Sequence, residues 1–549
     1  MKIALAQLNY HIGNFESNTE KIIKHIAEAR TNGADLVVFG ELCVCGYPSR
    51  DFLEFNEFIE LCKTSAKKIA EACKGIACII GLPTANTSAQ GKDLYNSAYF
   101  IENGKVKAIV NKALLPNYDI FDEYRYFEPS TEFNCIEFKG KRIALTICED
   151  LWNNFENPLY ITRPMDTLIL QEPDLMINIA ASPFSYKHDV ERIEILSDNA
   201  SRYQLPLFYV NNVGAQTELI FDGGSLVIDN TGKLIDEMPY FEEAIAYYDF
   251  EDKDAVTYKH HSTLRIEKQS EIDQIHKAII LGIRDYFYKS GFKQAILGLS
   301  GGIDSAVVCA LAAEALGSEN VMAVLLPSIY SSDHSIKDAE DLVKNLGCMY
   351  EIIPIKEVTA AFEITLKPQF NNLPFNIAEE NIQSRSRAVI LMAMCNKFGY
   401  ILLNTSNKSE AAVGYGTLYG DMCGGISVIG DVYKTQVFEL ARHINMDKEI
   451  IPINSIIKPP SAELRPNQKD TDSLPEYDVL DQIIALYVEG RYASEAIIKK
   501  GFDEKTVKKV IRLINISEHK RFQTPPILRV SPKAFGVGRR MPIVGKYLS

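Results

Sequence analysis

Residues 294–305 read QAILGLSGGIDS and join a short apolar run to a longer helical pattern. The apolar run predicts a buried strand, and residues 306–316 predict a helix that stops at Gly317. A glycine-rich loop between a strand and a helix presents free amides and a positive helix end, which together hold a phosphate group. Ser300 and Ser305 add hydroxyl donors. The stretch therefore predicts a phosphate site in an α/β fold.

The loop differs from the common lysine-containing phosphate loop, because no lysine follows its glycines. Asp304 instead places an acid where phosphate oxygens are expected, and it would repel them unless Mg²⁺ came between. The alternative interpretation of such a loop is a tight connection in a doubly wound sheet.

The SGGIDS string resembles the pyrophosphatase-type ATP loop of N-type ATP-dependent synthetases. Such enzymes transfer AMP to a carboxylate, release pyrophosphate, and let an amine displace the AMP. The resemblance implies a doubly wound parallel sheet of the adenine nucleotide alpha hydrolase type. It also implies ATP contacts from Gly298, Leu299, Ser300, Gly301, Gly302, Ile303, Asp304 and Ser305.

Five later segments indicate which family of these synthetases the chain resembles. In their order and spacing they are similar to the segments of the NAD⁺ synthetase family. They read EENIQSR at 379–385, NTSNKSE at 404–410, GDVYK at 430–434, DSLP at 472–475 and EHKR at 518–521. The resemblance implies that Thr405 contacts ATP and that Asp304 and Glu410 hold Mg²⁺. Contacts with the substrate deamido-NAD⁺ are implied for Asn381, Glu410 and Lys520.

Two of these residues also have ordinary structural interpretations. Glu410 would otherwise be a solvated carboxylate at a helix start, where the helix dipole stabilises it. Lys520 would otherwise be a surface lysine within a charged cluster.

In the N-terminal half, Glu41, Lys112 and Cys148 each end or follow a strand-like run. Functional groups in α/β folds gather at the carboxyl ends of strands. These three residue types are sufficient for amide hydrolysis. The glutamate takes the thiol proton, the thiolate attacks the amide carbon, and the lysine stabilises the oxyanion. A small buried cysteine is the alternative for Cys148.

The segments ELCVCGYP at 41–48, NKALLPNY at 111–118 and CEDLW at 148–152 resemble the signature blocks of the nitrilase, or carbon–nitrogen hydrolase, superfamily. The resemblance implies a stacked αββα sandwich with a Glu41–Lys112–Cys148 triad and a second glutamate, Glu123. In glutamine-using members it further implies that Tyr118 and Ser182 bind L-glutamine.

The segment after Ser182 departs from the pattern of those members. They carry a lysine six residues after the serine, whereas this chain has His188 there and Lys187 one step earlier. Either side chain could point at the glutamine carboxylate, and an ordinary surface histidine is the alternative for His188.

Alternating Val/Ile-rich and amphipathic runs predict an α/β protein over almost the whole chain. A strand at Ile3 to Leu8 leads to a helix entered by the capping box Ser17-x-x-Glu20. Further strands are expected at 36–39, 77–81, 105–110, 143–148, 175–179, 207–211 and 225–229. A second series follows, with helices at 271–288, 305–316 and 334–346 and strands at 294–299, 321–326 and 350–355.

The segment around residues 251–264 lacks periodicity and is expected to be a linker. We therefore expect an amidase domain over residues 1–250 and a synthetase domain over residues 265–549.

Composition excludes several classes of protein. Of 549 residues, 46% are hydrophobic and 24% charged, which is typical of a folded globular chain. The net charge of −14 disfavours non-specific binding to nucleic acid or to an anionic membrane. No run of 18 apolar residues occurs, and the eleven cysteines are scattered, so we expect a reduced cytoplasmic protein.

Taken together, the chain resembles the glutamine-using branch of the NAD⁺ synthetase family. The expected enzyme is a ligase in which an amidase releases ammonia from L-glutamine and a synthetase uses it, with ATP and Mg²⁺, to amidate deamido-NAD⁺. Family members form homo-oligomers. The rival hypotheses are an amidotransferase with an aspartate or xanthine-nucleotide acceptor, an unrelated hydrolase without ammonia transfer, and a nucleotide sensor with inactive sites.

Overall fold

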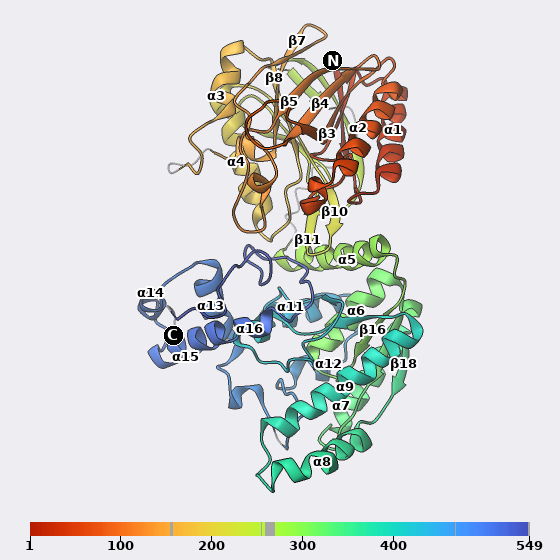
Figure 1. The fold of residues 1–549 in the computed structure, drawn as a ribbon, viewed down its shortest axis with the longest axis vertical. Helices are drawn as coiled ribbons and strands as arrows, with labels where there is room; N and C mark the ends of the chain where they lie inside the picture. Colours follow the sequence, from red (N-terminus) through yellow and green to blue (C-terminus); the bar gives the residue numbers. More distant parts are fainter. Residues whose placement is uncertain (154–157, 254, 259–269, 467, 547–549) are drawn as a thin grey trace. The chain divides into compact units, whose positions relative to one another are not determined.

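The computed structural model describes residues 1–153, 158–253, 255–258, 270–466 and 468–546 (Figure 1). The chain divides into two compact units, Met1–Gln269 and Ser270–Ser549. Each unit has its own sheets and its own hydrophobic core.

The first unit contains two large sheets. One has seven strands in the order β15-β14-β1-β2-β3-β4-β5 and the other six in the order β13-β12-β9-β8-β7-β6. The seven strands are β1 (Lys2–Gln7), β2 (Leu36–Phe39), β3 (Ala77–Ala85), β4 (Leu94–Glu102), β5 (Lys105–Asn111), β14 (Ala244–Asp252) and β15 (Ala255–Tyr258). The six are β6 (Ile136–Phe138), β7 (Lys141–Ile147), β8 (Leu175–Ala180), β9 (Leu207–Asn211), β12 (Leu226–Ile228) and β13 (Leu234–Glu237). A separate hairpin joins β10 (Val213–Gln216) to β11 (Leu219–Asp222).

The two sheets face each other, and helices cover their outer faces (Figure 1). Strand β1 shows the alternation that this layering requires. Ile3 and Leu5 belong to the core shared by both sheets, whereas Ala4 and Ala6 pack beneath the helices on the outer face. The helices of this unit are α1 (Phe15–Thr31), α2 (Asn56–Ala72), α3 (Pro164–Leu168) and α4 (His188–Tyr203). The expected αββα sandwich is confirmed.

Two local expectations in the first unit are wrong. Helix α1 begins at Phe15 rather than at Ser17, because the side chain of Asn14 accepts the backbone amide of Ser17 and caps the helix earlier. The expected linker is in part sheet, since β14 runs to Asp252 and β15 pairs antiparallel with it. The remainder of that linker, residues 259–264, lies outside the described residues.

The second unit is built on a parallel five-stranded sheet in the order β18-β17-β16-β19-β20. Its strands are β16 (Ala295–Gly298), β17 (Val321–Leu325), β18 (Met349–Ile352), β19 (Ile401–Asn404) and β20 (Ile426–Ser427). Because the order reverses between β16 and β19, the loops that follow these two strands separate and leave a crevice at their carboxyl ends. The expected doubly wound parallel sheet is confirmed.

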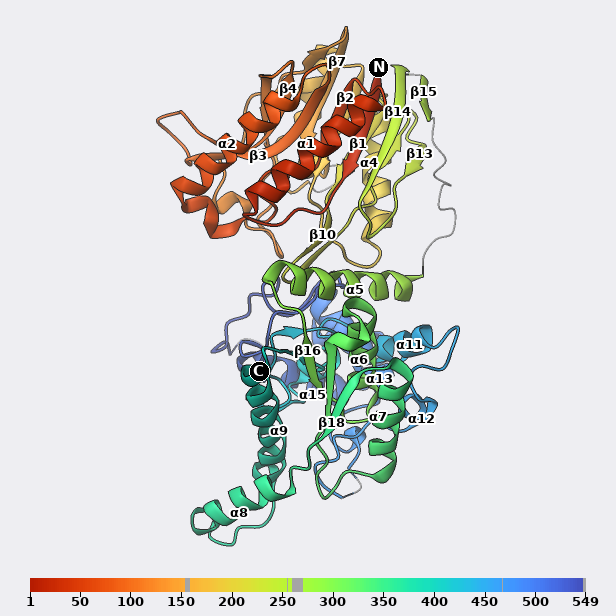
Figure 2. The same cartoon turned by 90° about the vertical axis from the view of Figure 1, so that its right-hand side faces the viewer.

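Helices cover both faces of this sheet, with α9 on one side and α6 and α7 on the other (Figure 2). On the α9 side, Leu391 and Cys395 pack against Ile296 and Val324 of the strands. The helices are α5 (Glu271–Ser290), α6 (Ile303–Leu316), α7 (Asp333–Leu346), α8 (Lys356–Phe370), α9 (Ile377–Phe398), α10 (Lys408–Val413), α11 (Lys434–Ile444), α12 (Ile453–Ile457), α13 (Tyr477–Ile484), α14 (Ser494–Lys499), α15 (Glu504–Ile516) and α16 (Glu518–Arg521). Among the described residues, no helix has both the length and the apolar character that a membrane crossing needs.

Removing a large side chain from the core between the two sheets should destabilise the first unit. Leu145 of β7 is 1% exposed in that core, so Leu145→Ala should lower the free energy of unfolding by about 2–5 kcal/mol. The chain has one tryptophan, Trp152, and its fluorescence during urea denaturation reports this unit selectively. Val106→Ala on β5, where the side chain is 42% exposed, should cost less than about 1 kcal/mol, and equal losses for both variants would contradict this core assignment.

Candidate functional site

A cavity of about 440 Å³ lies at the carboxyl ends of β16 and β19 in the second unit. The loop after β16 forms one wall, where Gly301 has a φ of +79° that favours glycine. A side chain at Gly301 would also collide with the backbone carbonyl oxygen of Ser335. Glycine is therefore required at position 301 for two reasons: the backbone conformation is left-handed, and the backbone of α7 lies too close for a side chain.

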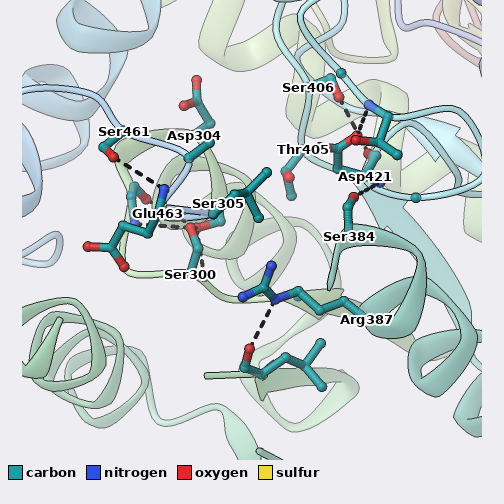
Figure 3. Close-up of a pocket in the computed structure, with 18 of the residues that line it drawn as sticks. Ser300, Asp304, Ser305, Ser384, Arg387, Thr405, Ser406, Asp421, Ser461 and Glu463 are labelled. Atoms are coloured by element: carbon teal, nitrogen blue, oxygen red, sulfur yellow. Dashed lines mark hydrogen bonds between the residues drawn. The ribbon is translucent and has the colours of Figure 1, made fainter. Parts of the chain in front are cut away.

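Hydrogen bonds inside the loop hold it in shape without a ligand. The hydroxyls of Ser300 and Ser305 lie 3.1 Å apart, the Gly302 amide donates to Ser300 Oγ at 3.2 Å, and Ser305 Oγ donates to the Gly302 carbonyl at 3.1 Å. Figure 3 shows Ser300, Asp304 and Ser305 on one side of the cavity and Thr405 on the other. The arrangement is a preformed phosphate cradle at the start of α6.

Asp304 faces a second carboxylate, that of Glu410, and the ammonium of Lys434 lies between them. Lys434 Nζ forms an ion pair with Asp304 and lies 3.7 Å from Glu410 Oε1, and Asn407 Nδ2 donates to Asp304 Oδ1 at 2.8 Å. Burial, followed by the charge of Asp304, raises the pKa of Glu410 to about 8. Glu410 is therefore a confined carboxylate in a charged cluster, and the solvated-carboxylate interpretation does not describe it.

The remaining residues predicted for nucleotide binding line the same cavity. Thr405 follows β19, and the Asn381 side chain on α9 accepts a hydrogen bond from Thr417 Oγ1 at 2.8 Å. Lys520 of α16 donates to the carbonyls of Gly414 and Gly416 at 2.7 and 2.8 Å, with its ammonium at the cavity wall. Lys520 is half-buried, so its surface-lysine interpretation does not describe it either.

Three basic side chains that line the cavity had no role predicted from the sequence. Lys434 lies within the quoted GDVYK segment, and its place beside Asp304 follows only from the fold. Arg387 is two residues beyond the quoted EENIQSR segment and donates from Nε to the Leu326 carbonyl at 3.0 Å. Lys458, which pairs with Asp338 at 3.1 Å, carried no motif that marked it.

In the first unit, Lys112 lies between Glu41 and Glu123. Its Nζ is 2.7 Å from Glu41 Oε1 and 2.9 Å from Glu123 Oε1, and all three side chains are at most 5% exposed. Glu41 Oε2 accepts the Ala181 amide at 2.9 Å, and Tyr47 donates to Glu123 Oε1 at 2.8 Å. Burial alone would lower the pKa of Lys112, but the charges of Glu123 and Glu41 raise it, so the lysine stays protonated.

Cys148 begins the short helix η3 (Cys148–Leu151) directly after β7, with a φ of 43° that is unusual for a residue with a side chain. Asp150 fixes this turn by accepting the amides of Ile147, Ala113 and Leu114 at 2.9–3.0 Å. Because the last two amides follow Lys112, one carboxylate ties the lysine segment to the cysteine turn.

The Cys148 thiol is protonated at rest. Burial, followed by the charge of Glu41, raises the pKa of Cys148, and Lys112 only partly offsets this. A neighbouring lysine by itself favours a thiolate, but here burial and the charge of Glu41 have the larger effects on the pKa of the thiol. The thiol therefore needs a base when substrate binds, and Glu41 is the carboxylate that most strongly affects its charge.

The residues expected to bind glutamine surround the same turn. Tyr118 donates to both carboxylate oxygens of Glu149, at 3.0 and 3.1 Å, and burial raises the pKa of Glu149 to about 7. Ser182 Oγ lies 3.1 Å from His188 Nε2, and the His188 ring stacks on Trp152 with centroids 5.1 Å apart.

His188 and Lys187, the two candidates for contact with the glutamine carboxylate, occupy different places. His188 contacts Ser182, whereas the Lys187 ammonium lies 5.6 Å from the centre of the Tyr186 ring. His188 is thus a half-buried neighbour of the cysteine turn, with 19% of its side chain exposed.

Two family models match the two units. The carbon–nitrogen hydrolase family matches residues 2–259, and the NAD synthase family matches residues 275–524.

Relatives of known name are similar over the full length. The glutamine-dependent NAD(+) synthetase of Synechocystis sp. is 47% identical over 550 residues, covering 98% of each chain. That of Thermotoga maritima is 40% identical over 582 residues, covering 100% of this chain and 99% of the relative. Among solved structures, the glutamine-dependent NAD⁺ synthetase of Acinetobacter baumannii in complex with ADP has 37% identity and a TM-score of 0.78, covering 99% of this chain and 98% of that one. The chain that carries this cysteine turn and this phosphate loop belongs to the family of glutamine-dependent NAD⁺ synthetases.

Proposed function

We propose that this chain converts deamido-NAD⁺, ATP, L-glutamine and water into NAD⁺, AMP, pyrophosphate and L-glutamate. The observation that carries the proposal is the presence in one chain of a Glu–Lys–Cys site and of a phosphate loop with a facing carboxylate pair. The first arrangement suits amide hydrolysis, and the second suits transfer of AMP.

In the amidase half, Glu41 takes the proton of the Cys148 thiol as the sulfur attacks the amide carbon of glutamine. Lys112 lies beside Glu41, where its ammonium can stabilise the oxyanion of the tetrahedral intermediate. Collapse of that intermediate passes a proton to the leaving nitrogen, which departs as ammonia and leaves a thioester. Water, deprotonated by the same glutamate, then hydrolyses the thioester to glutamate and free thiol.

In the synthetase half, the carboxylate of deamido-NAD⁺ attacks the α-phosphorus of ATP, and pyrophosphate leaves. Adenylation is required because a free carboxylate has no adequate leaving group for an incoming amine. Ammonia then attacks the acyl carbon, and AMP departs as NAD⁺ forms. Asn381, Thr405 and Lys520 line the cavity in which both substrates must meet.

The residues beside the loop fit Mg²⁺, which usually takes one or two carboxylates and completes its shell with phosphates and water. Asp304 and Glu410 supply two neighbouring carboxylates. Among the residues that the structure describes, no group of three or more His, Cys, Asp or Glu side chains could hold a metal ion, so this pair is the kind of partial site that Mg²⁺ uses. We assign Asp304 and Glu410 as the residues that hold the ion, whose role is to neutralise charge on the departing pyrophosphate.

We further propose that two copies of the chain associate through β18, α8 and α9. Strand β18 is an edge strand whose four residues are all exposed. Exposed apolar side chains occur on β18 (Met349), on α8 (Ile364), in the loop after α8 (Leu373) and on α9 (Val389 and Phe398). An edge strand flanked by so many apolar side chains favours a second protein surface over water.

All eleven cysteines are free thiols, the state maintained in a reducing compartment, so we assign the enzyme to the cytoplasm.

Replacing the nucleophile should separate the two nitrogen sources. Cys148→Ala should reduce glutamine-driven NAD⁺ synthesis more than about a thousandfold, because no thioester can form, while ammonium-driven synthesis is retained. Both rates are measured by the appearance of NAD⁺. Cys135→Ala, a half-buried cysteine of the same unit, is the matched control and should keep both rates. Loss of both activities in Cys148→Ala alone would show that the assignment of separate reactions is wrong.

Removing the carboxylate at the loop should stop adenylation whatever the nitrogen source. Asp304→Asn should lower pyrophosphate release more than about a hundredfold with glutamine or with ammonium, since Mg²⁺ loses a charged ligand. Glutamine hydrolysis by the other unit, measured as glutamate, should continue. Asp333→Asn on the exposed start of α7 should leave pyrophosphate release unchanged. Normal pyrophosphate release in Asp304→Asn would refute the metal-binding role.

A charge on the apolar face should prevent association of the synthetase halves. Val389 of α9 is 66% exposed, and Val389→Glu would bury an unpaired carboxylate in the proposed interface. Analytical ultracentrifugation should then show a fall in mass by at least half relative to the wild-type assembly. Leu170→Glu, an exposed leucine of the first unit, should leave the mass unchanged, and an unchanged mass in Val389→Glu would exclude this interface.

A further inference from the structure

Asn96 of β4 forms hydrogen bonds with all three charged residues of the amidase site, although no motif marked it. Its side-chain Nδ2 donates to Glu41 Oε1 at 2.7 Å and to Glu123 Oε2 at 3.3 Å. Its backbone carbonyl accepts the amide of Lys112 at 2.8 Å. The side chain is completely buried. One residue therefore holds both carboxylates by its amide and the lysine backbone by its carbonyl.

The orientation of this amide follows from the charges around it. Turning the amide over would place its oxygen against two carboxylates, so the nitrogen must face them. Its Oδ1 is buried and has no hydrogen-bond partner among the residues that the structure describes. The two hydrogen bonds from Nδ2 therefore hold the side chain in this orientation, although its own oxygen stays unpaired. Buried asparagines with a purely structural role usually have their oxygen paired as well.

The cluster needs a donor without charge at this position. Two carboxylates and one ammonium leave one negative charge in a buried site, and burial raises the pKa of Glu123. The other titratable groups that face the cluster are Tyr47 from the loop after β2, Cys148, Glu149 and Asp150 from η3, and Tyr160 from the segment that follows η3. A lysine in place of Asn96 would cancel the charge needed to accept the thiol proton, and an aspartate would add a third negative charge.

We propose that Asn96 is a positioning residue of the glutaminase reaction, which holds Glu41 and Glu123 apart on either side of Lys112 and stabilises their negative charge with neutral hydrogen bonds. The inference rests on the proposed function of the first unit. Asn96 acts through Glu41, whose Oε2 carries a single backbone hydrogen bond from Ala181 and therefore has a lone pair for the thiol proton.

Two substitutions should move the pH profile of glutamine hydrolysis in opposite directions. Asn96→Ala removes the donor that favours the ionised carboxylates, so the acidic limb should move to higher pH. Asn96→Asp can donate only while protonated and repels its neighbours once ionised, so the alkaline limb should move to lower pH. In both variants kcat should fall about tenfold to a hundredfold, while KM for glutamine stays within about twofold of wild type.

The control is Asn18→Ala on α1, which removes a buried asparagine whose amide donates only to the carbonyls of His11 and Val44. Its pH profile should match that of wild type. Trp152 fluorescence shows whether each variant is folded, and Asn96→Asp, which has nearly the shape of asparagine, gives the result if the alanine variant does not fold.

A folded Asn96 variant whose pH profile matches that of wild type would overturn the proposal. So would profiles of Asn96→Ala and Asn96→Asp that both shift in the same direction. A rise in KM without a change in kcat would overturn it as well. Failure of the proposed function looks different, because wild-type protein would then release no glutamate from glutamine in the same assay.

Discussion

A lysine buried between two carboxylates is the interaction on which both candidate sites depend. Lys112, Lys408 and Lys434 are among the largest fully buried side chains, and each has two carboxylate neighbours. An ammonium taken out of water must be paired, and a second carboxylate gives the group one spare negative charge whenever both carboxylates are ionised. Around Lys408, hydrogen bonds from Ser531 to Asp431 share that charge and anchor the C-terminal segment. In the other two clusters, the spare charge faces the place where chemistry is expected.

The two sites use the spare charge differently because they differ in burial. Glu41 and Lys112 are at most 1% exposed, whereas Asp304 and Glu410 are 19% and 16% exposed along an open cavity. In the dry site the charge can accept a proton from a thiol that burial keeps protonated. In the wetter site it can hold a hydrated cation together with phosphates of an incoming nucleotide. In the function that we propose, the same kind of ion cluster serves proton transfer in one unit and metal binding in the other.

Sequence patterns predicted the strands that are continuous apolar runs and the helices whose apolar residues recur with the helical period. The apolar runs at 36–39 and 207–211 coincide with β2 and β9, and the helix expected at 271–288 is α5, which runs to Ser290. Strand β4 was missed because LYNSAYFIE mixes polar and apolar residues on both faces, one of which lines the amidase site. Asn96 was missed for a different reason, because its neighbours Glu41 and Glu123 are distant from it in the sequence. Family motifs located the residues that we propose to bind or react. Their charged and polar neighbours, such as Asn96, Asp150 and Lys434, became visible only when the fold brought the segments together.

In the reaction that we propose, the amide nitrogen of glutamine becomes the carboxamide nitrogen of NAD⁺. The most direct measurement supplies the full chain with ATP, Mg²⁺, deamido-NAD⁺ and amide-¹⁵N glutamine, without added ammonium, and reads the mass of the dinucleotide product. We expect NAD⁺ that carries one ¹⁵N, with glutamate, AMP and pyrophosphate formed alongside it. Unlabelled NAD⁺, or glutamate formed without any NAD⁺, would contradict it.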